Sequence, residues 1–577
     1  MRDFALGTFE EAAGFIRQNE IGRRARIETP FGPRLVYYAD LTATGRYLHF
    51  VEAWMRRIMP FYANTHTMIS STGRVMTELR EQARRVVRDT LHASDEDEVL
   101  FCGSGATAAV NTLVGVLGLT ISEPLEREYR LSSHIPDAER PVVFVGPYEH
   151  HSNELPWLES VAEVVEVALM PSGAIALEDL AEKLTRHRHR RLRIGSFSAA
   201  SNVSGVLTDV PSIARLLHAH GAYACFDYAA AGPYVPIDMH PEDDDAARLD
   251  AVFLSPHKFV GGPGASGLLV ANRALFRSRT PARPGGGTVD YVAGPERDDV
   301  DYVGRLEERE ESGTPAIVGD IRAGVALLVK EMLGPARLLE HETALARRAL
   351  ERLARRPEIE LLGPTELPRL GILSFNVKRL HHDLVSALLD HLFGIQNRAG
   401  CSCAGPYGHR LLGIDAATSE RIRGFIREGI SGIKPGWVRI SLPYFATEED
   451  FEYVMRAIEF VAEHGRDFVP AYRLGWRDGV WRHTTRAVLE PMPIELSAAA
   501  LTEAAHGFAG SDHETPISEA RMTRERARYF EEARRLAEEL RARAKQKPPR
   551  FNPPTGRAEL DDLVWFDFVQ ADGLSEP

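Results

Sequence analysis

Short apolar runs alternate with longer amphipathic stretches through residues 98–275. The runs include EVLFCG, PVVFVG and DAVFLS, and TDVPSIARLLHAHG is typical of the stretches between them. This alternation is typical of parallel strands joined by crossover helices, so it predicts an α/β fold with a mostly parallel sheet. In such a sheet, ligands collect beyond the carboxyl ends of the strands. We therefore expect chemistry at the residues that directly follow each apolar run.

The pattern changes along the chain and predicts five segments. Residues 1–34 are expected to form an N-terminal helical segment, and 35–314 a large domain. In 315–357, AIVGDIRAGVALLVKEML is spaced to bury one face and predicts linking helices. Strand-like runs and helices over 358–469 predict a smaller α/β domain. Residues 470–577 carry a charged helix and a Pro-rich stretch, and we expect this extension to pack on the surface or contact a second copy.

Composition narrows the class of protein. With 577 residues, of which 44% are hydrophobic, the chain can form two or more domains. The net charge is −13 and acidic residues are spread along the chain, which argues against a nucleic-acid partner. The sequence has neither a run of about 18 uncharged apolar residues nor the order of a secretory signal. We expect a soluble cytoplasmic protein with no membrane partner, and its four cysteines fit a reducing compartment.

Lys258 and Asp227 each follow or end an apolar run. Lys258 lies in SPHKFVGGPGASG, where glycines allow a bulky ligand to approach the backbone. A lone lysine is usually a solvated surface charge, whereas a Schiff-base lysine must be partly desolvated to act as nucleophile and base. Asp227 ends AYACFD one crossover earlier, so its carboxylate could keep a pyridinium nitrogen protonated at the same site. The alternative for Asp227 is a capping or turn aspartate.

Two further segments carry groups that suit a phosphorylated aromatic ligand. In FCGSGATAAV a glycine-rich turn leads into an apolar helix, whose first N–H groups suit a phosphate, although any βα turn can be rich in glycine. In EHHSNELPW, His150 could lie over an aromatic ring while His151 or Asn153 holds the loop. A metal site would need further ligands that this pattern does not supply, so no metal is expected.

Together these segments resemble a known family. The motifs YANTH, GSGAT, EHHSN, SNVSG, FDYAAA, SPHK, GGG, SGTP, RAGCSCAGP and VRISLPYFATEEDF follow the order and rough spacing of the class V aminotransferase superfamily, in its cysteine desulfurase and selenocysteine lyase branch. The resemblance covers about residues 35–465. It implies the fold-type I architecture of enzymes that use pyridoxal 5'-phosphate (PLP). That architecture has a large domain with a mostly parallel, seven-stranded-type sheet and a smaller C-terminal α/β domain.

The resemblance also implies which residues surround PLP. Lys258 would hold the cofactor as a Schiff base, Asp227 would bind the pyridine nitrogen, and His150 would stack on the ring. Thr314 matches a residue that family dimers donate to the neighbouring subunit, so a homodimer is implied. The full set of expected cofactor-binding residues is Ala106, Thr107, His150, Asn202, Asp227, Ser255, His257, Lys258 and Thr314.

The implied chemistry centres on Cys403, which matches the nucleophile of the desulfurases in NRAGCSCAGPYG. Lys258 and His150 are the other catalytic candidates. The implied substrate is a small L-amino acid, with cysteine favoured, and a separate sulfur-acceptor protein is a possible partner. A planar, two-pronged arginine suits the substrate carboxylate. The expected substrate-binding residues are His66, Asn202, Arg398 and Arg439.

Some features depart from the family pattern or leave alternatives open. Ala230 stands where relatives usually have a glutamine three residues after the ring aspartate, so one hydrogen bond to the cofactor is absent or replaced. The segment LLGIDAATSERIRGFIREGISGIKPGW lengthens the chain between Cys403 and Arg439. Cys403 could instead be a buried small residue or half of a redox pair with Cys401.

Three functions are therefore weighed. The first is a cysteine desulfurase that carries the sulfur as a persulfide on Cys403 and releases alanine. The second is another class V enzyme that does not use Cys403, such as a selenocysteine or C–S lyase, an epimerase or an aminotransferase. The third is a scaffold of the same fold that has lost its chemistry, which the joint presence of Lys258, Asp227 and His150 argues against.

Overall fold

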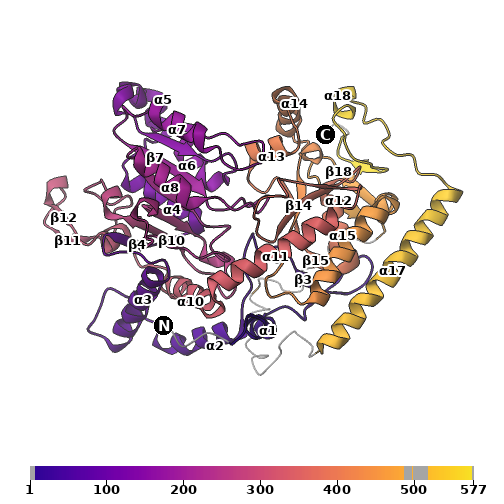
Figure 1. Ribbon diagram of the computed structural model, residues 1–577, viewed down its shortest axis with the longest axis horizontal. Helices are drawn as coiled ribbons and strands as arrows, with labels where there is room; N and C mark the ends of the chain where they lie inside the picture. The colour runs from indigo at the N-terminus through magenta and orange to yellow at the C-terminus, as the bar shows by residue number, and fades with distance from the viewer. Residues whose placement is uncertain (1–6, 486–496, 498–516, 575–577) are drawn as a thin grey trace.

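The computed structural model describes residues 7–485, 497 and 517–574. Parts of the expected N-terminal segment and C-terminal extension therefore lie outside the described residues. In Figure 1 a large domain lies on the left and a smaller one on the right, and the long helices α10 (Ile317–Leu333) and α11 (Pro335–Leu353) run between them. The domain boundaries expected from the sequence stay predictions.

A seven-stranded sheet forms the centre of the large domain. Its strand order is β4-β10-β9-β8-β7-β5-β6. Strands β5 to β9 run parallel to one another, whereas β10 is antiparallel to both β4 and β9. The mostly parallel sheet predicted from the sequence is confirmed. The strands are β4 (Asp97–Cys102), β5 (Val142–Val145), β6 (Glu163–Glu166), β7 (Arg193–Ser198), β8 (Tyr223–Asp227), β9 (Ala251–Leu254) and β10 (Gly267–Asn272).

The strands are continuous apolar runs because both faces of the sheet are buried. Successive residues of one strand point to opposite faces, so Val252 packs into one hydrophobic core and Phe253 into another. Helix α4 contacts β9 and β10, α8 contacts β8, and α3 packs along α10. The helices of this domain are α2 (His49–Ile58), α3 (Ser71–Thr90), α4 (Gly105–Val116), α5 (Glu123–Tyr129), α6 (Leu155–Leu158), α7 (Leu177–Arg186), α8 (Val210–Ala219) and α9 (Leu306–Glu310).

The edge strand β4 is covered by acidic side chains at and just after α9. Glu307 accepts a hydrogen bond from the N–H of Val99 at 3.1 Å, and Glu311 accepts one from the N–H of Phe101 at 2.8 Å. Arg84 donates to the carbonyl of Val99 and binds Glu311 at 2.9 Å. These contacts satisfy backbone groups that an edge strand otherwise leaves unpaired.

The small domain contains an antiparallel sheet with the order β13-β14-β17-β16. Helices α12 and α15 pack together beside this sheet and build a second extensive core. The main elements here are β13 (Ile359–Leu361), β14 (Ile372–Val377), β16 (Arg398–Gly400), β17 (Trp437–Ser441), α12 (His382–Phe393), α13 (Gly405–Leu411), α14 (Ala416–Arg427) and α15 (Glu448–Phe468).

The described part of the C-terminal extension packs on the small domain. Helix α17 (Glu519–Gln546), yellow in Figure 1, lies along α15 and α12 and buries Tyr529 and Phe530 in their core. Buried Asp450 binds Arg526 of this helix at 2.7 Å and Arg23 of the N-terminal segment at 2.9 Å. The described extension is therefore an integral layer of the small domain.

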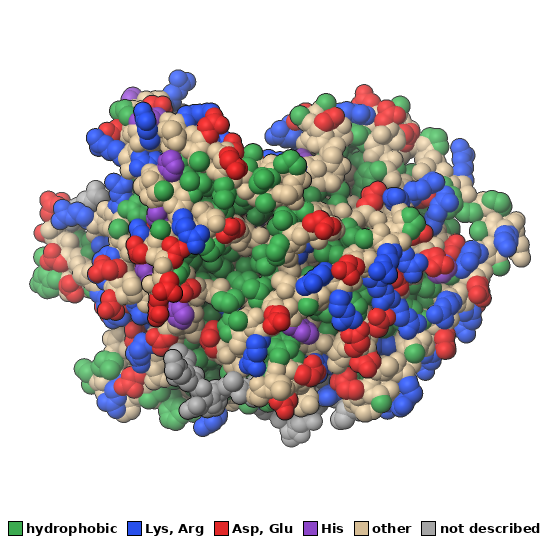
Figure 2. Space-filling view, in the orientation of Figure 1, with side chains coloured by type: hydrophobic (Ala, Val, Ile, Leu, Met, Phe, Trp, Pro, Cys, Tyr) green, Lys and Arg blue, Asp and Glu red, His purple; other side chains and the backbone are tan. Residues whose placement is uncertain are grey.

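Short elements complete the described chain. Strand β3 pairs in parallel with β15, so the beginning of the large domain is attached to the small domain. Figure 2 shows a notch at the upper edge of the molecule, between the regions that carry α5 and α14 in Figure 1. The remaining helices and strands are α1 (Phe9–Asn19), α18 (Ala558–Asp561), β1 (Arg26–Ile27), β2 (Arg34–Leu35), β3 (Tyr37–Tyr38), β11 (Val289–Val292), β12 (Val300–Tyr302), β15 (Ile395–Gln396), β18 (Tyr472–Gly475), β19 (Trp481–His483) and β20 (Ala571–Asp572).

Across the described ranges, every helix is either too short or too polar to cross a lipid bilayer.

Candidate active site

A cavity of about 270 Å³ lies beyond the carboxyl ends of the central strands, where the large domain meets the small one. Side chains from both domains line it, as expected for a ligand site in an open α/β sheet. Eleven of the residues predicted from the sequence meet in this cavity: Ala106, Thr107, His150, Asn202, Asp227, Ser255, His257, Lys258, Arg398, Cys403 and Arg439.

Lys258 occupies a single 3₁₀ turn, Pro256–Lys258, that follows β9 after Ser255. Its side chain is partly buried, and the loss of hydration lowers the pKa of its amine to about 8, although the negative charge of Asp227 opposes this shift. An amine with such a pKa has a substantial neutral fraction near neutral pH. Lys258 can therefore act as a nucleophile or a base.

Asp227 is the last residue of β8, and its side chain is buried, with 4% of its surface exposed. One carboxylate oxygen accepts a hydrogen bond from the N–H of Ala229 at 2.7 Å. Burial raises the pKa of Asp227, whereas this hydrogen bond and the charge of Lys258 lower it. The carboxylate is thus suited to sharing a proton with a buried basic nitrogen.

His150 lies in the loop that follows β5, and it is held as a neutral imidazole. Its Nδ1 accepts a hydrogen bond from the N–H of Ser152 at 3.1 Å, which leaves the ring proton on Nε2. Burial and the nearby Lys258 lower the pKa of His150 to about 3. A neutral, fixed ring of this kind can stack on a flat ligand without adding charge to the cavity.

The first turn of α4 and the residues after β9 form one end of the cavity. Gly105 has a φ of +56°, and a Cβ at this position would lie 2.7 Å from the Oγ of Ser255, so glycine is needed there. The N–H of Ala106 donates to the Oγ of Ser255 at 2.9 Å. Burial lowers the pKa of His257 to about 4 and leaves it neutral. Exposed Thr107 and the N-terminus of this helix suit a phosphate group.

Two arginines of the small-domain sheet face the other end of the cavity. Arg398 on β16 and Arg439 on β17 are direct partners in the strand register. Asp40 lies between them, 3.0 Å from Nε of Arg398 and 3.2 Å from Nη2 of Arg439. Asp40 was not predicted from the sequence, although it is a carboxylate that closely follows the apolar run LVYYA, a signal of the kind that identified Asp227.

Cys403 lies on an exposed loop between β16 and α13. Ser402 and Cys403 have φ values of +50° and +56°, a backbone region that costs non-glycine residues about 1–2 kcal/mol each. Three hydrogen bonds hold the loop: Asn202 Nδ2 donates to the Ser402 carbonyl at 2.8 Å, the His151 N–H to the Cys403 carbonyl at 2.9 Å, and the Gly405 N–H to Nε2 of His151 at 3.1 Å. The Cys403 thiol is thus presented to the cavity by a fixed backbone.

Two predicted residues lie away from this cavity. His66 and Thr314 are exposed, and Thr314 accepts a hydrogen bond from the side chain of Asn64 at 3.3 Å. A Cβ on Gly287 would lie 3.1 Å from the ring of His66, so His66 lies over the glycine-rich segment that follows residue 284. Their expected roles in cofactor and substrate binding stay predictions.

The polar groups of the cavity fit PLP. Within the described ranges, the Oδ1 of Asn202, the Nε of Arg439 and the Oγ of Ser402 are buried without a hydrogen-bond partner. Such atoms are costly unless a ligand or water binds them. Groups that suit a phosphate come from the first turn of α4 and the residues after β9, a buried carboxylate and a lysine lie in the same cavity, and two arginines come from the small-domain sheet. Ala230 is buried, and its methyl group cannot replace the hydrogen bond of a glutamine.

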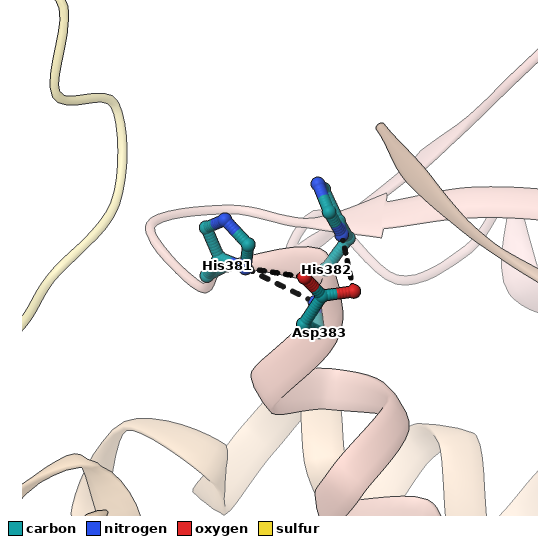
Figure 3. Close-up of side chains that lie close together, drawn as sticks. All are labelled: His381, His382 and Asp383. Carbon is teal, nitrogen blue, oxygen red and sulfur yellow. Dashed lines mark hydrogen bonds and ion pairs between the residues drawn. The ribbon is translucent and has the colours of Figure 1, made fainter. Parts of the chain in front are cut away.

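His381, His382 and Asp383 form the one group of described residues whose side chains could jointly offer ligand atoms to a metal ion, all within 4.8 Å (Figure 3). The contacts are those of a helix N-terminus, because the N–H of Asp383 donates to Nδ1 of His381 at 3.1 Å at the start of α12. Nε2 of His382 lies 3.2 Å from the Lys434 carbonyl. The group does not line the cavity, and we interpret it as the N-terminal cap of α12.

Comparison with known proteins gives consistent matches. The model of the aminotransferase class-V family matches residues 37–454. A probable cysteine desulfurase of Halalkalibacterium halodurans is 28% identical over 382 residues, which cover 65% of this chain and 85% of the relative. A probable cysteine desulfurase of Streptomyces coelicolor is 28% identical over 392 residues, covering 67% and 87%.

Solved structures of cysteine desulfurases have the same fold. The apo structure from Thermococcus onnurineus superimposes with a TM-score of 0.60 at 25% identity, covering 74% of this chain and 95% of that one. A structure from Escherichia coli gives a TM-score of 0.57 at 23% identity, covering 74% and 94%, and supports the fold alone.

Proposed function

Since the chain belongs to the class-V aminotransferase family, we propose that it is a PLP-dependent cysteine desulfurase, which passes the sulfur of L-cysteine to Cys403 and releases alanine. One observation carries this proposal: an exposed thiol, a low-pKa lysine and a buried arginine line the same cavity. The similarity to probable cysteine desulfurases and to a solved cysteine desulfurase structure supports the same activity.

The chain's own residues would hold PLP in defined ways. Lys258 would bind it covalently, Asp227 would pair with the pyridine nitrogen, and His150 would cover the ring. The phosphate would lie at the start of α4, near Thr107, Ser255 and His257. When bound, PLP would supply an electron sink for the negative charge that develops at the substrate Cα.

The substrate would be oriented by its carboxylate. Arg439 offers a planar donor, and within the described residues its Nε has no hydrogen-bond partner. Asn202 lies beside it, since the backbone carbonyl of Asn202 accepts a hydrogen bond from Nη1 of Arg439 at 3.1 Å. The amine of Lys258, with a pKa of about 8, would then remove the proton from the substrate Cα.

Sulfur transfer uses the thiol of Cys403. The sulfur of Cys403, acting as a thiolate, attacks the sulfur of the bound cysteine; an S–S bond forms and the Cβ–S bond breaks. The electron pair of the broken bond stays on the substrate carbon and takes up a proton there, so that alanine leaves and Cys403 carries a persulfide. The reaction needs no external oxidant, because the substrate carbon takes the electron pair of the broken bond. A sulfur-acceptor protein or a reducing thiol would then take the terminal sulfur.

A homodimer is part of this proposal. The segment around α2 and the residues before α3 exposes large apolar side chains, including Phe61 (50% exposed), Tyr62 (55%) and Ile69 (96%). Exposed apolar patches mark interfaces. If a second copy binds to this surface, His66 and Thr314 of one copy would lie near the cofactor of the other. We also propose a reducing compartment, such as the cytoplasm, because the Cys403 thiol must stay reduced.

Alanine and sulfide release from L-cysteine, with a reductant present, tests the proposed function. The intact holoenzyme is compared with Cys403→Ser, Lys258→Ala and the matched control Cys401→Ser. We expect both Lys258→Ala and Cys403→Ser to lose activity and Cys401→Ser to keep it. If only Lys258→Ala is inactive, the protein is another class-V enzyme in which Cys403 takes no part. If the intact holoenzyme forms no alanine, the proposed substrate is wrong.

A further inference from the structure

We propose that Asp40 determines which substrates the cavity accepts, by balancing one of its two arginine charges so that the cavity favours amino acids with a neutral side chain over those with an anionic one. The inference rests on the proposed function, because it assigns the arginine end of the cavity to the substrate carboxylate. Asp40 belongs to the site through its contacts with Arg398 and Arg439, which lie far away in the sequence.

The need for a carboxylate follows from the strand register. Arg398 and Arg439 are direct partners on adjacent antiparallel strands, and like charges in that position repel each other. Asp40 bridges them: its Oδ2 lies 3.0 Å from both Nε and Nη2 of Arg398, and its Oδ1 lies 3.2 Å from Nη2 of Arg439. One carboxylate is thus shared by two guanidinium groups.

The position of Asp40 is fixed by the backbone on both sides of it. The N–H of Ala39 donates to the Gln396 carbonyl at 2.8 Å, and the N–H of Ser441 donates to the Ala39 carbonyl at 2.7 Å. The N–H of Thr42 donates to the Oγ of Ser441 at 3.0 Å. Asp40 itself is 8% exposed. Its carboxylate therefore stays with the arginines and does not turn out into solvent when a ligand enters.

The remaining charge matches a single carboxylate. Two guanidinium groups and one carboxylate leave one positive charge at this end of the cavity, and the charge of Lys258 is opposed by buried Asp227. His150 and His257 are neutral at pH 7, because burial lowers their pKa values to about 3 and about 4. The α-carboxylate of an amino acid completes the balance. A second, side-chain anion would be repelled by the negative charge of Asp40, which is 8% exposed.

Removing the charge but not the shape of Asp40 tests this inference. The holoenzyme and its Asp40→Asn variant are titrated with L-asparagine and L-aspartate, which have nearly the same shape and differ in charge. Binding is followed by the absorbance change of the bound cofactor. We expect the ratio of the two dissociation constants to shift towards aspartate by about tenfold or more in Asp40→Asn.

A second variant makes the test reciprocal. Arg398→Gln removes one positive charge, so the same ratio should shift away from aspartate, and the double variant Asp40→Asn, Arg398→Gln should return close to the ratio of the intact protein. If Asp40→Asn weakens both ligands by one common factor, Asp40 only positions the arginines and the inference is wrong. The titration measures ligand binding and does not require sulfur transfer. Its result therefore tests the role of Asp40 separately from the release of alanine from cysteine.

Discussion

Burial sets the charge of individual residues that line the cavity. The same effect acts on buried groups nearby that do not line the cavity. Glu149 precedes His150 and is 5% exposed. Its carboxylate accepts hydrogen bonds from the N–H of Ser198 at 2.8 Å, from the Oγ of Ser198 at 2.6 Å and from Nδ2 of Asn153 at 2.6 Å. Burial raises the pKa of Glu149 to about 7 despite these contacts. Glu149 therefore ties the His150 loop to β7 and carries a proton at mildly acidic pH.

This pKa predicts how stability depends on pH. The folded state binds the proton of Glu149 more tightly than the unfolded state does. The resulting contribution to the free energy of unfolding is fully present below about pH 4.5 and is lost as the pH rises to about 7. The loss amounts to roughly 3 kcal/mol. Replacing Glu149 with Gln should flatten this part of the dependence, as measured by denaturant unfolding between pH 5 and pH 8 (roughly the window that the shift spans). An unchanged pH profile in Glu149→Gln would contradict a raised pKa.

Among the secondary-structure elements, the short helix α9 protects the edge of the main sheet. Glu307 and Glu311 accept from alternate N–H groups of β4, and Arg80 and Arg84 bind Glu311 from α3. The charges of this network are largely buried, with side-chain exposures of 9% or less for Arg80, Arg84 and Glu311. Breaking one member of such a network leaves the others unpaired.

Glu311→Ala should therefore lower the free energy of unfolding by about 3–5 kcal/mol, because it leaves two buried guanidinium groups and the Phe101 N–H without this acceptor. Glu308→Ala, on the preceding helix α9, is the matched control. Its ion pair with Arg305 is 2.8 Å long and about half exposed on both sides, so removing it should change stability by less than about 1 kcal/mol. Equal losses in the two variants, measured by denaturant unfolding, would show that the edge contacts do not stabilise the sheet.

At the scale of the whole molecule, the proposal requires two copies of the chain. Ile69 is one of the exposed apolar residues before α3, and it should be buried between the two copies. Ile69→Glu should therefore shift the protein from dimer towards monomer in light scattering and weaken cofactor retention, because Thr314 and His66 would no longer reach the second copy. Leu125→Glu on α5, which is 46% exposed in the structure, is the control and should leave the mass unchanged. A monomeric intact protein that retains PLP would contradict the dimer.

Parts of this arrangement were accessible from the sequence because each signal was local. Buried parallel strands are continuous apolar runs, and Lys258, Asp227 and His150 end or follow such runs, so their convergence could be predicted. The antiparallel direction of β10 could not, since an apolar run does not encode strand direction. Asp40 was missed because its partners, Arg398 and Arg439, are 358 and 399 residues away. The expected roles of His66 and Thr314 stay predictions, because both residues lie outside the cavity of the described chain.

Mass spectrometry of the peptide that contains Cys403 can detect the proposed persulfide itself. The holoenzyme is mixed with L-cysteine without reductant, alkylated and digested, and Lys258→Ala is treated in parallel. We predict one additional sulfur atom on Cys403 in the intact protein, formed together with one alanine, and none in Lys258→Ala. Alanine formed without added sulfur on Cys403, or with the sulfur on Cys401 in a Cys403→Ser variant, would contradict it.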